Sequence, residues 1–201
     1  MALRFNESIQ KNILDHPISG EREPFAHAAS LFIYHAEAKY KRINYNLKYR
    51  GGIAMGRFFS SLLGEKLSLS PLFEDVDLVI PVPLHWLRRW RRGYNQAEII
   101  ASELTKSLEA PLNTTILLRK RRTRTQTKLS VSRKWDNVKD AFTLNPKLSH
   151  WGVNPTQIKH ILVVDDVFTT GATLASCLAA LRNYFPNDVK ISVATLAMVD
   201  E

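Results

Sequence analysis

Short apolar runs alternate along the chain with segments in which apolar residues recur every three or four positions. The runs predict strands at residues 28–35, 76–80, 115–118, 141–144, 161–164 and 189–198. The periodic segments predict helices at residues 36–49, 53–67, 94–109 and 172–184. Because strands and helices alternate, we expect a parallel sheet that is covered by helices on both faces.

Positive charge is concentrated in the middle of the chain. The 201 residues include 28 lysines and arginines and 19 acidic residues, which gives a net charge of +9. Residues 88–134 hold 13 of the basic residues against three acidic ones, so their local net charge is +10 and the remainder sums to −1. Such a cluster is usually a solvated face, but a bound polyanion would relieve the repulsion between neighbouring like charges.

Cysteine content and hydropathy exclude several classes of protein. The single cysteine, Cys177, can form neither an internal disulfide nor a multi-thiolate metal site, and its spacing in a predicted helix indicates a core position. No apolar run approaches the roughly 18 residues of a membrane span, and the N-terminus lacks the apolar stretch of a signal peptide. We therefore expect a cytoplasmic protein without membrane contact.

The most informative segment is residues 161–173, ILVVDDVFTTGAT. Four apolar residues predict a buried strand, and Asp165 and Asp166 stand at its carboxyl end, where open parallel sheets bind ligands. The turn that follows offers hydroxyl groups, backbone N–H groups and a helix N-terminus, which together favour a phosphate dianion. The two carboxylates could accept hydrogen bonds from sugar hydroxyls or face a hydrated divalent cation. The segment therefore predicts a site for a phosphorylated sugar.

A plainer interpretation of the same residues is a strand, a turn and a helix cap. Thr169 or Thr170 would then cap the helix, and the two carboxylates would be solvated. An isolated Asp-Asp or Thr-Gly pair is usually of this kind. The joint pattern of apolar run, acid pair, Thr-Thr-Gly turn and helix is much rarer.

This joint pattern resembles the fingerprint of the type I phosphoribosyltransferases across all 13 positions. The resemblance implies that the turn holds the 5-phosphate of phosphoribosyl pyrophosphate (PRPP), and that Asp165 and Asp166 bind the 2- and 3-hydroxyls of its ribose. The implied phosphate-binding residues are Thr169, Thr170, Gly171, Ala172 and Thr173.

Further segments, in order along the chain, resemble the ComF/GntX subfamily: residues 47–51, 80–85, 92–96, 125–130, 133–137 and 141–142. By this resemblance, residues 81–88 are the pyrophosphate-binding loop, and residues 119–137 include a loop that closes over the site. The implied residues of the pyrophosphate loop and its surroundings are Pro83, Leu84, His85, Arg88 and Arg92. Arg88, Arg92, Arg124 and Arg133 are the expected contacts of the leaving group.

The resemblance also implies the fold and the cofactor. We expect an α/β fold with a parallel sheet of four to five strands and a small hood, built from the N-terminal region and with residues 141–144 as a further candidate part. Residues 25–201 would form the phosphoribosyltransferase domain. Mg²⁺ is expected to arrive with PRPP near the acid pair, without a direct protein ligand. ComF-type chains commonly begin with a four-cysteine zinc ribbon, which this sequence lacks, so residues 1–24 are interpreted as a lead-in or as a linker left beside a missing ribbon.

Two functions follow from the resemblance. The favoured one is an enzyme that transfers the phosphoribosyl group of PRPP to an acceptor that the sequence does not identify. Its rival is a non-catalytic PRPP sensor or a single-stranded nucleic-acid adaptor on the same fold, because ComF-type proteins are associated with bacterial DNA uptake. Trp86, Trp90 and Trp135 lie among basic residues, an arrangement that can stack nucleic-acid bases. Weak binding of single strands is therefore expected, and the oligomeric state stays open.

Overall fold

The computed structural model describes residues 25–35, 52–85, 87, 90, 93–120, 141–147 and 152–200. Three predicted segments lie wholly or mainly outside these residues: the lead-in at 1–24, the helix at 36–49 and the basic loop at 120–139.

Four parallel strands form the central sheet, in the order β1-β6-β5-β2. These strands are β1 (Ala28–His35), β2 (Leu78–Pro81), β5 (His160–Phe168) and β6 (Lys190–Asp200). A separate antiparallel pair consists of β3 (Leu117–Arg119) and β4 (Phe142–Leu144). The predicted parallel α/β class is confirmed. The strand at 141–144 belongs to the small pair, while β1 forms an edge of the main sheet.

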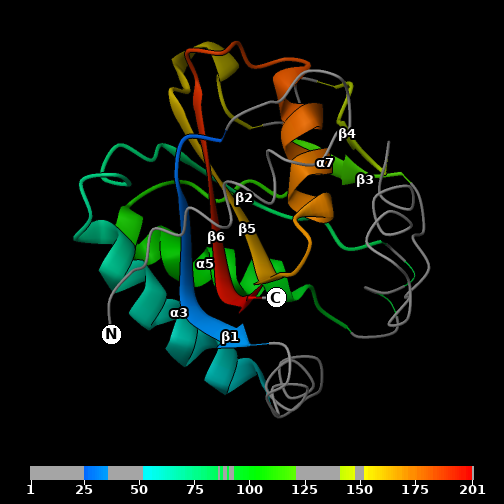
Figure 1. Cartoon of the computed structure of the whole chain (residues 1–201). Coiled ribbons are helices and arrows are strands. Elements are labelled where there is room, and N and C mark those ends of the chain that lie inside the picture. Colours follow the sequence, from blue (N-terminus) through cyan, green and yellow to red (C-terminus); the bar gives the residue numbers. More distant parts are fainter. Residues whose placement is uncertain are drawn as a thin grey trace.

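Helices cover both faces of the sheet (Figure 1). α3 (Gly52–Ser68) and α5 (Gln96–Leu108) pack against each other on one face, and α7 (Ala172–Arg182) lies on the other face, beside β3 and β4. A short 3₁₀ helix, η2 (Pro155–Gln157), precedes β5.

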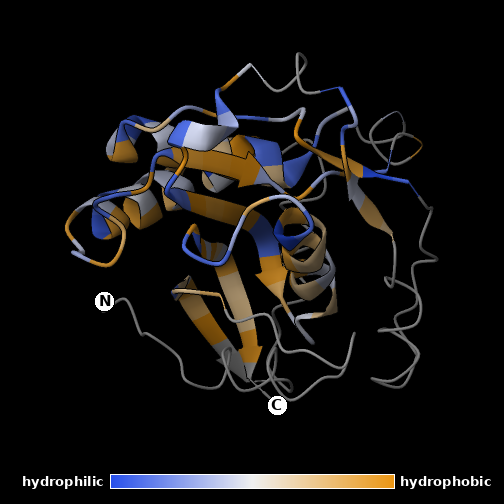
Figure 2. Ribbon diagram, turned by 90° about the horizontal axis from the view of Figure 1, so that it is seen from above, coloured by the Kyte–Doolittle hydropathy of each residue, from blue (hydrophilic) through white to orange (hydrophobic). Residues whose placement is uncertain are grey.

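The central strands are hydrophobic along most of their length because both of their faces are covered (Figure 2). Side chains alternate along β5: Ile161 and Val163 join the core under α7, whereas Leu162 and Val164 join the core under α3 and α5. These four side chains are completely buried.

Several predicted boundaries shift for local reasons. β5 continues past residue 164 to Phe168, because the neighbouring strand β6 pairs with it as far as Met198. β3 begins only at Leu117, since the side chain of Asn113 accepts hydrogen bonds from the backbone N–H groups of Thr115 and Ile116 and holds them in a turn. α7 ends two residues before position 184.

A polar cluster closes the amino end of the sheet. The buried imidazole of His160 lies 2.5 Å by its Nδ1 from Oδ1 of Asp75 and 2.7 Å by its Nε2 from Oγ of Ser192. Lys190 Nζ donates to the second carboxylate oxygen of Asp75 at 2.5 Å. Ser192 is completely buried at the edge opposite the carboxyl ends of the strands, so this serine–histidine–aspartate arrangement joins strands rather than meeting a substrate.

The carboxylate of Asp75 makes this cluster sensitive to acid. Partial burial would raise its pKa, but the hydrogen bonds from Lys190 and His160 outweigh that effect and lower the pKa to about 2. A carboxyl with a lowered folded-state pKa stabilises the fold above its ordinary pKa near 3.8 and loses that contribution as the pH falls toward 2.

Asp75→Asn is therefore expected to destabilise the protein by on the order of 1 kcal/mol at pH 6, because the carboxylate is partly exposed and screened. The difference between wild type and variant should shrink between pH 4 and pH 2. Urea unfolding at pH 6, 4, 3 and 2 measures it, with Glu74→Gln at the neighbouring exposed position as control. A difference that stays constant over this range would contradict the assignment.

Candidate functional site

A step in the central sheet creates an open edge beside the acid pair. β2 ends at Pro81, opposite Val164, and the N–H of Val82 donates to the carbonyl of Val164 at 2.8 Å. β5 continues beyond this point with Asp165 and Asp166, and Asp165 stands level with Thr195 of β6. The pairing of β2 with β5 therefore ends at Val164, directly before the acid pair. Such a step at the carboxyl ends of parallel strands is where open α/β sheets bind ligands.

The two carboxylates at the end of β5 interact with each other. Both residues are half-buried, and Oδ1 of Asp165 accepts a hydrogen bond from the backbone N–H of Asp166 at 2.9 Å. Ile161 and Val163 precede Asp165 on the α7 side of β5, and α7 carries Cys177, whose thiol interacts electrostatically with Asp165. Burial raises the pKa of Asp165 well above its ordinary value, and the charge of Asp166 raises it further, while the Asp166 N–H and Arg119 act in the opposite direction.

The turn after β5 ends at Gly171, whose backbone has a conformation that only glycine adopts easily. Gly171 has φ of 77° in the left-handed region and stands at the N-cap of α7, where no side chain makes a capping hydrogen bond. Its carbonyl accepts from the N–H of Ala175 at 2.9 Å. The plainer interpretation, in which Thr169 or Thr170 caps the helix, is therefore wrong. Without a side-chain cap, the first N–H groups of α7 keep their capacity to bind an anion.

The loop after β2 is tied to the start of α5. Asn95 caps α5 by accepting from the N–H of Ala97 at 3.2 Å, and its Nδ2 donates to the carbonyl of Val82 at 3.0 Å. His85 is buried in this loop, and its Nδ1 accepts from the N–H of Leu87 at 3.3 Å, which leaves the proton of the neutral ring on Nε2. Pro83 and Leu84 are half-buried beside it. The interpretation that residues 94–96 start the helix and orient the loop agrees with these contacts.

The structure brings some of the predicted site residues together and does not describe others. Asp165, Asp166 and the turn at 169–173 are continuous at the end of β5, and the loop with Pro83, Leu84 and His85 follows the neighbouring strand β2. The four arginines predicted to contact the leaving group lie outside the described residues: Arg88, Arg92, Arg124 and Arg133.

Arg119 is a charged residue near the acid pair to which the sequence assigned no role of its own. Arg119, at the end of β3, places its guanidinium carbon 5.1 Å from the centroid of the Phe142 ring. Burial lowers the pKa of Arg119, whereas Cys177 and Asp165 act to raise it. Cys177 is completely buried in α7, as predicted, and burial followed by the charge of Asp165 raises the pKa of its thiol. The signal in the sequence is a cation at an inward position of an otherwise apolar strand.

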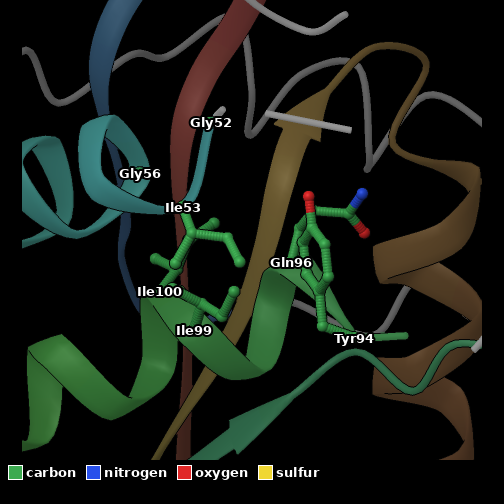
Figure 3. Close-up of a pocket in the computed structure, with 7 residues that line it drawn as sticks. All are labelled: Gly52, Ile53, Gly56, Tyr94, Gln96, Ile99 and Ile100. Carbon is green, nitrogen blue, oxygen red and sulfur yellow. The ribbon is translucent and has the colours of Figure 1, made fainter. Parts of the chain in front are cut away.

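A small pocket opens between the first turns of α3 and α5 (Figure 3). It is lined by Gly52, Ile53, Gly56, Tyr94, Gln96, Ile99 and Ile100. The lining is apolar apart from the tyrosine and the glutamine, and it contains no charged side chain. The pocket therefore suits neither a phosphate nor a metal ion. Within the described ranges, no three histidine, cysteine or acidic residues cluster as a metal site.

The fold and this site define a class: an α/β domain with an acid pair and a glycine-turned helix start at one strand end, as the resemblance to phosphoribosyltransferases predicts. Sequence comparison then supports the narrower resemblance, because the chain is similar to proteins named for competence and for DNA utilization. It is 36% identical over 115 residues to competence protein F of Haemophilus influenzae and 37% identical over 99 residues to DNA utilization protein YhgH of Escherichia coli K12. No protein-family profile matches the chain.

These matches are partial. They cover 57% and 49% of this chain, and 48% and 40% of the two relatives, so the chain spans less than half the length of the relatives it matches. Among solved structures, an orotate phosphoribosyltransferase from Aeropyrum pernix is similar with a TM-score of 0.40 and 19% identity, over 77% of this chain and 64% of that one. Similarity at this level carries no inference about activity. In the described part of the chain, no helix has the length and apolar character of a membrane span.

Proposed function

We propose that this protein binds PRPP together with Mg²⁺ and transfers the phosphoribosyl group to an acceptor nucleophile. The observation that carries the proposal is the continuity of the acid pair, the Gly171 turn and the start of α7 at one strand end. The residues from Thr169 to Thr173 would hold the 5-phosphate, since uncapped N–H groups and hydroxyls donate to its oxygens. Asp165 and Asp166 would accept hydrogen bonds from the ribose hydroxyls.

The pyrophosphate group would lie over the loop that follows β2. This loop follows β2, which pairs with β5, and it is held by Asn95. Arg88 and Arg92 follow it in the sequence, and Arg124 and Arg133 belong to the second basic segment. Among the described residues, the two neighbouring carboxylates are the acidic groups at this strand end, and no third metal-binding side chain joins them. Two carboxylates suit a Mg²⁺ ion that PRPP carries into the site. Bound in this way, Mg²⁺ would neutralise the charge of the pyrophosphate.

Transfer breaks the bond between ribose C1 and the pyrophosphate oxygen, which leaves with the bonding electrons. A lone pair of the acceptor forms the new bond to C1, and the acceptor gives up a proton. Cationic side chains favour this step by stabilising the negative charge that develops on the leaving pyrophosphate. The carboxylates beside the ribose favour the positive charge that develops on the sugar.

Titration calorimetry of the purified chain with PRPP tests the binding step. We expect saturable binding with 5 mM Mg²⁺ and its loss when EDTA replaces the cation. Ribose 5-phosphate and pyrophosphate serve as partial ligands that should compete. A pyrophosphate-release assay with a panel of nucleobases and amines then tests transfer. Binding that is indifferent to Mg²⁺, or no binding at all, would contradict the proposal.

A specific observation also supports the second function, a nucleic-acid adaptor. The indole of Trp90 is 81% exposed and stands between arginines at positions 89 and 91. An exposed aromatic ring among cations suits base stacking and backbone contact. Two of the relatives carry names that refer to competence and to DNA utilization. In this function PRPP would act as a signal without turnover, and we propose a cytoplasmic location for either function.

A further inference from the structure

The two edges of the central sheet differ in how they are protected. β2, at one edge, is four residues long and is covered from outside, because Val79 donates its N–H to the carbonyl of Pro111 and accepts from the N–H of Asn113. β1, at the other edge, is eight residues long, and among the described residues β6 is the one strand that pairs with it. Its outer edge therefore presents a backbone to which a further strand can add.

The sequence of β1 lacks the features that normally protect an exposed edge. Edge strands are usually kept from associating by charged residues, by proline or by short length. This strand has the sequence AASLFIYH and contains no lysine, arginine, acidic residue, proline or glycine. Phe32 and Ile33 near its carboxyl end are half-buried. A long, uncharged and apolar edge of this kind is a predicted site of strand-to-strand association.

An exposed apolar flank of α3 continues this edge. Met55 and Phe58 are 39% and 60% exposed, and the half-buried Leu62 follows one turn later on the same side of the helix. The ring of Phe58 lies 5.4 Å from that of Phe59, which in turn lies 5.0 Å from the ring of Phe32 on β1. The apolar flank, defined as Met55, Phe58 and Leu62, therefore borders the outer strand of the sheet.

The position of α3 suits the pairing of two copies of the chain. α3 contacts both β1 and β6, so it lies over the two outermost strands at this edge (Figure 1). If two copies of β1 pair side by side, strands lie about 4.8 Å apart, and the two α3 helices then lie two strand spacings, or about 10 Å, apart. Packed helices are separated by about 8–10 Å. Strand pairing and helix packing are therefore compatible in one arrangement.

We propose that the protein forms a two-fold dimer in which β1 pairs antiparallel with β1 of a second copy and the apolar flanks of the two α3 helices pack together. Both copies use the same surface, as a two-fold axis requires. Because residues 111–113 cover the β2 edge, the main sheet of each copy offers one edge, and assembly stops at two copies. The carboxyl ends of the two sheets point in opposite directions, so each copy keeps its own site. The inference is therefore independent of the proposed function.

Sedimentation velocity of the full chain, over a concentration series from about 1 to 100 µM, tests the dimer. We expect the wild type to sediment as two chains of 23.0 kDa at the upper end of the series. In Phe58→Glu the dissociation constant should rise about 30-fold or more, because the two-fold axis places the new charge on both sides of the interface. Leu118→Glu makes the same kind of replacement at an exposed position of β3 and should dimerise like the wild type.

Hydrogen exchange of the backbone amides of residues 28–33 tests the strand pairing itself. Amides on the outer edge should exchange about tenfold more slowly where the dimer predominates, and Phe58→Glu should abolish this difference. A wild type that is monomeric at the highest concentration overturns the proposal, as does a dimer that Phe58→Glu leaves intact. Exchange in β1 that does not depend on concentration overturns it as well. If Phe58→Glu does not fold, Met55→Glu on the same flank takes its place with the same outcomes.

Discussion

Replacing Asp165 and Asp166 together with asparagine is expected to lower the affinity for PRPP by about 100-fold or more while the fold survives. Hydrogen bonds to charged groups contribute about 1.5–3 kcal/mol each, so the loss of two charged acceptors is sufficient for this effect. The carboxylates lie beyond the end of the β2–β5 pairing. The buried core residues of β5 next to them, Val163 and Val164, are unchanged in this variant, so the fold should survive. Calorimetry with PRPP and Mg²⁺ measures the change.

The same site should show a stability effect of the opposite sign. Because the pKa of Asp165 is raised by burial and by Asp166, the folded state retains a proton that the unfolded state has already released. The free energy of unfolding therefore falls as the pH rises from the ordinary pKa of 3.8 toward the folded-state value. The raised pKa already includes the attraction of Arg119, so Asp165→Asn is expected to stabilise the ligand-free protein at neutral pH, by on the order of 1 kcal/mol or about 2–4 °C in Tm.

Two exposed acidic residues away from the step, Glu74 and Asp188, provide the matched control. Glu74→Gln with Asp188→Asn removes the same charge. This control should leave the affinity for PRPP unchanged and should not stabilise the protein. Retained affinity in the acid-pair variant would refute the sugar site. Destabilisation by Asp165→Asn would instead indicate that the carboxylate is held mainly by favourable contacts.

The candidate site could be proposed from the sequence because its components are contiguous in it. The apolar run at 161–164, the two carboxylates and the Thr-Thr-Gly turn are contiguous, and a buried strand that runs into a helix leaves few alternatives for their arrangement. The positive φ of Gly171 explains physically why glycine stands at that point of the pattern. The interaction between the two carboxylates, and the extension of β5 to Phe168 that carries them, appear only in the structure.

Contacts between distant segments could not be predicted from one sequence. Arg119 belongs by composition to the basic cluster, and its pairing with the ring of Phe142 across 23 positions depends on the β3–β4 ladder. In the same way His160 shows no ligand spacing, yet it joins Asp75 and Ser192, which are 85 and 32 positions away. Such partners are fixed by sheet order and packing, which are properties of the whole fold.

Binding of single-stranded DNA is expected to be weak, independent of sequence and steeply dependent on salt. Only a few of the 13 basic residues at 88–134 can reach a ligand as small as pyrophosphate, so the others need another partner or remain solvated. Each neutralised phosphate releases a counterion, with a slope of about −0.7 per charge in a plot of log affinity against log salt. Arg121→Ala with Arg122→Ala should therefore make the slope shallower by about 1.4.

Fluorescence anisotropy of a labelled oligonucleotide between 25 and 200 mM salt measures this slope. Lys147→Ala with Lys159→Ala removes the same charge from exposed positions outside the basic segment. This control should leave the slope near its wild-type value, because it changes only the net charge of the protein and removes no contact with the oligonucleotide. If PRPP with Mg²⁺ competes with the oligonucleotide, the two ligands share a surface, as an enzyme with a basic entrance would require. Tight binding that ignores PRPP, together with no pyrophosphate release, would favour the adaptor over the enzyme. Absence of binding at the lowest salt would remove the nucleic-acid function and leave the surplus charge as a solvated face.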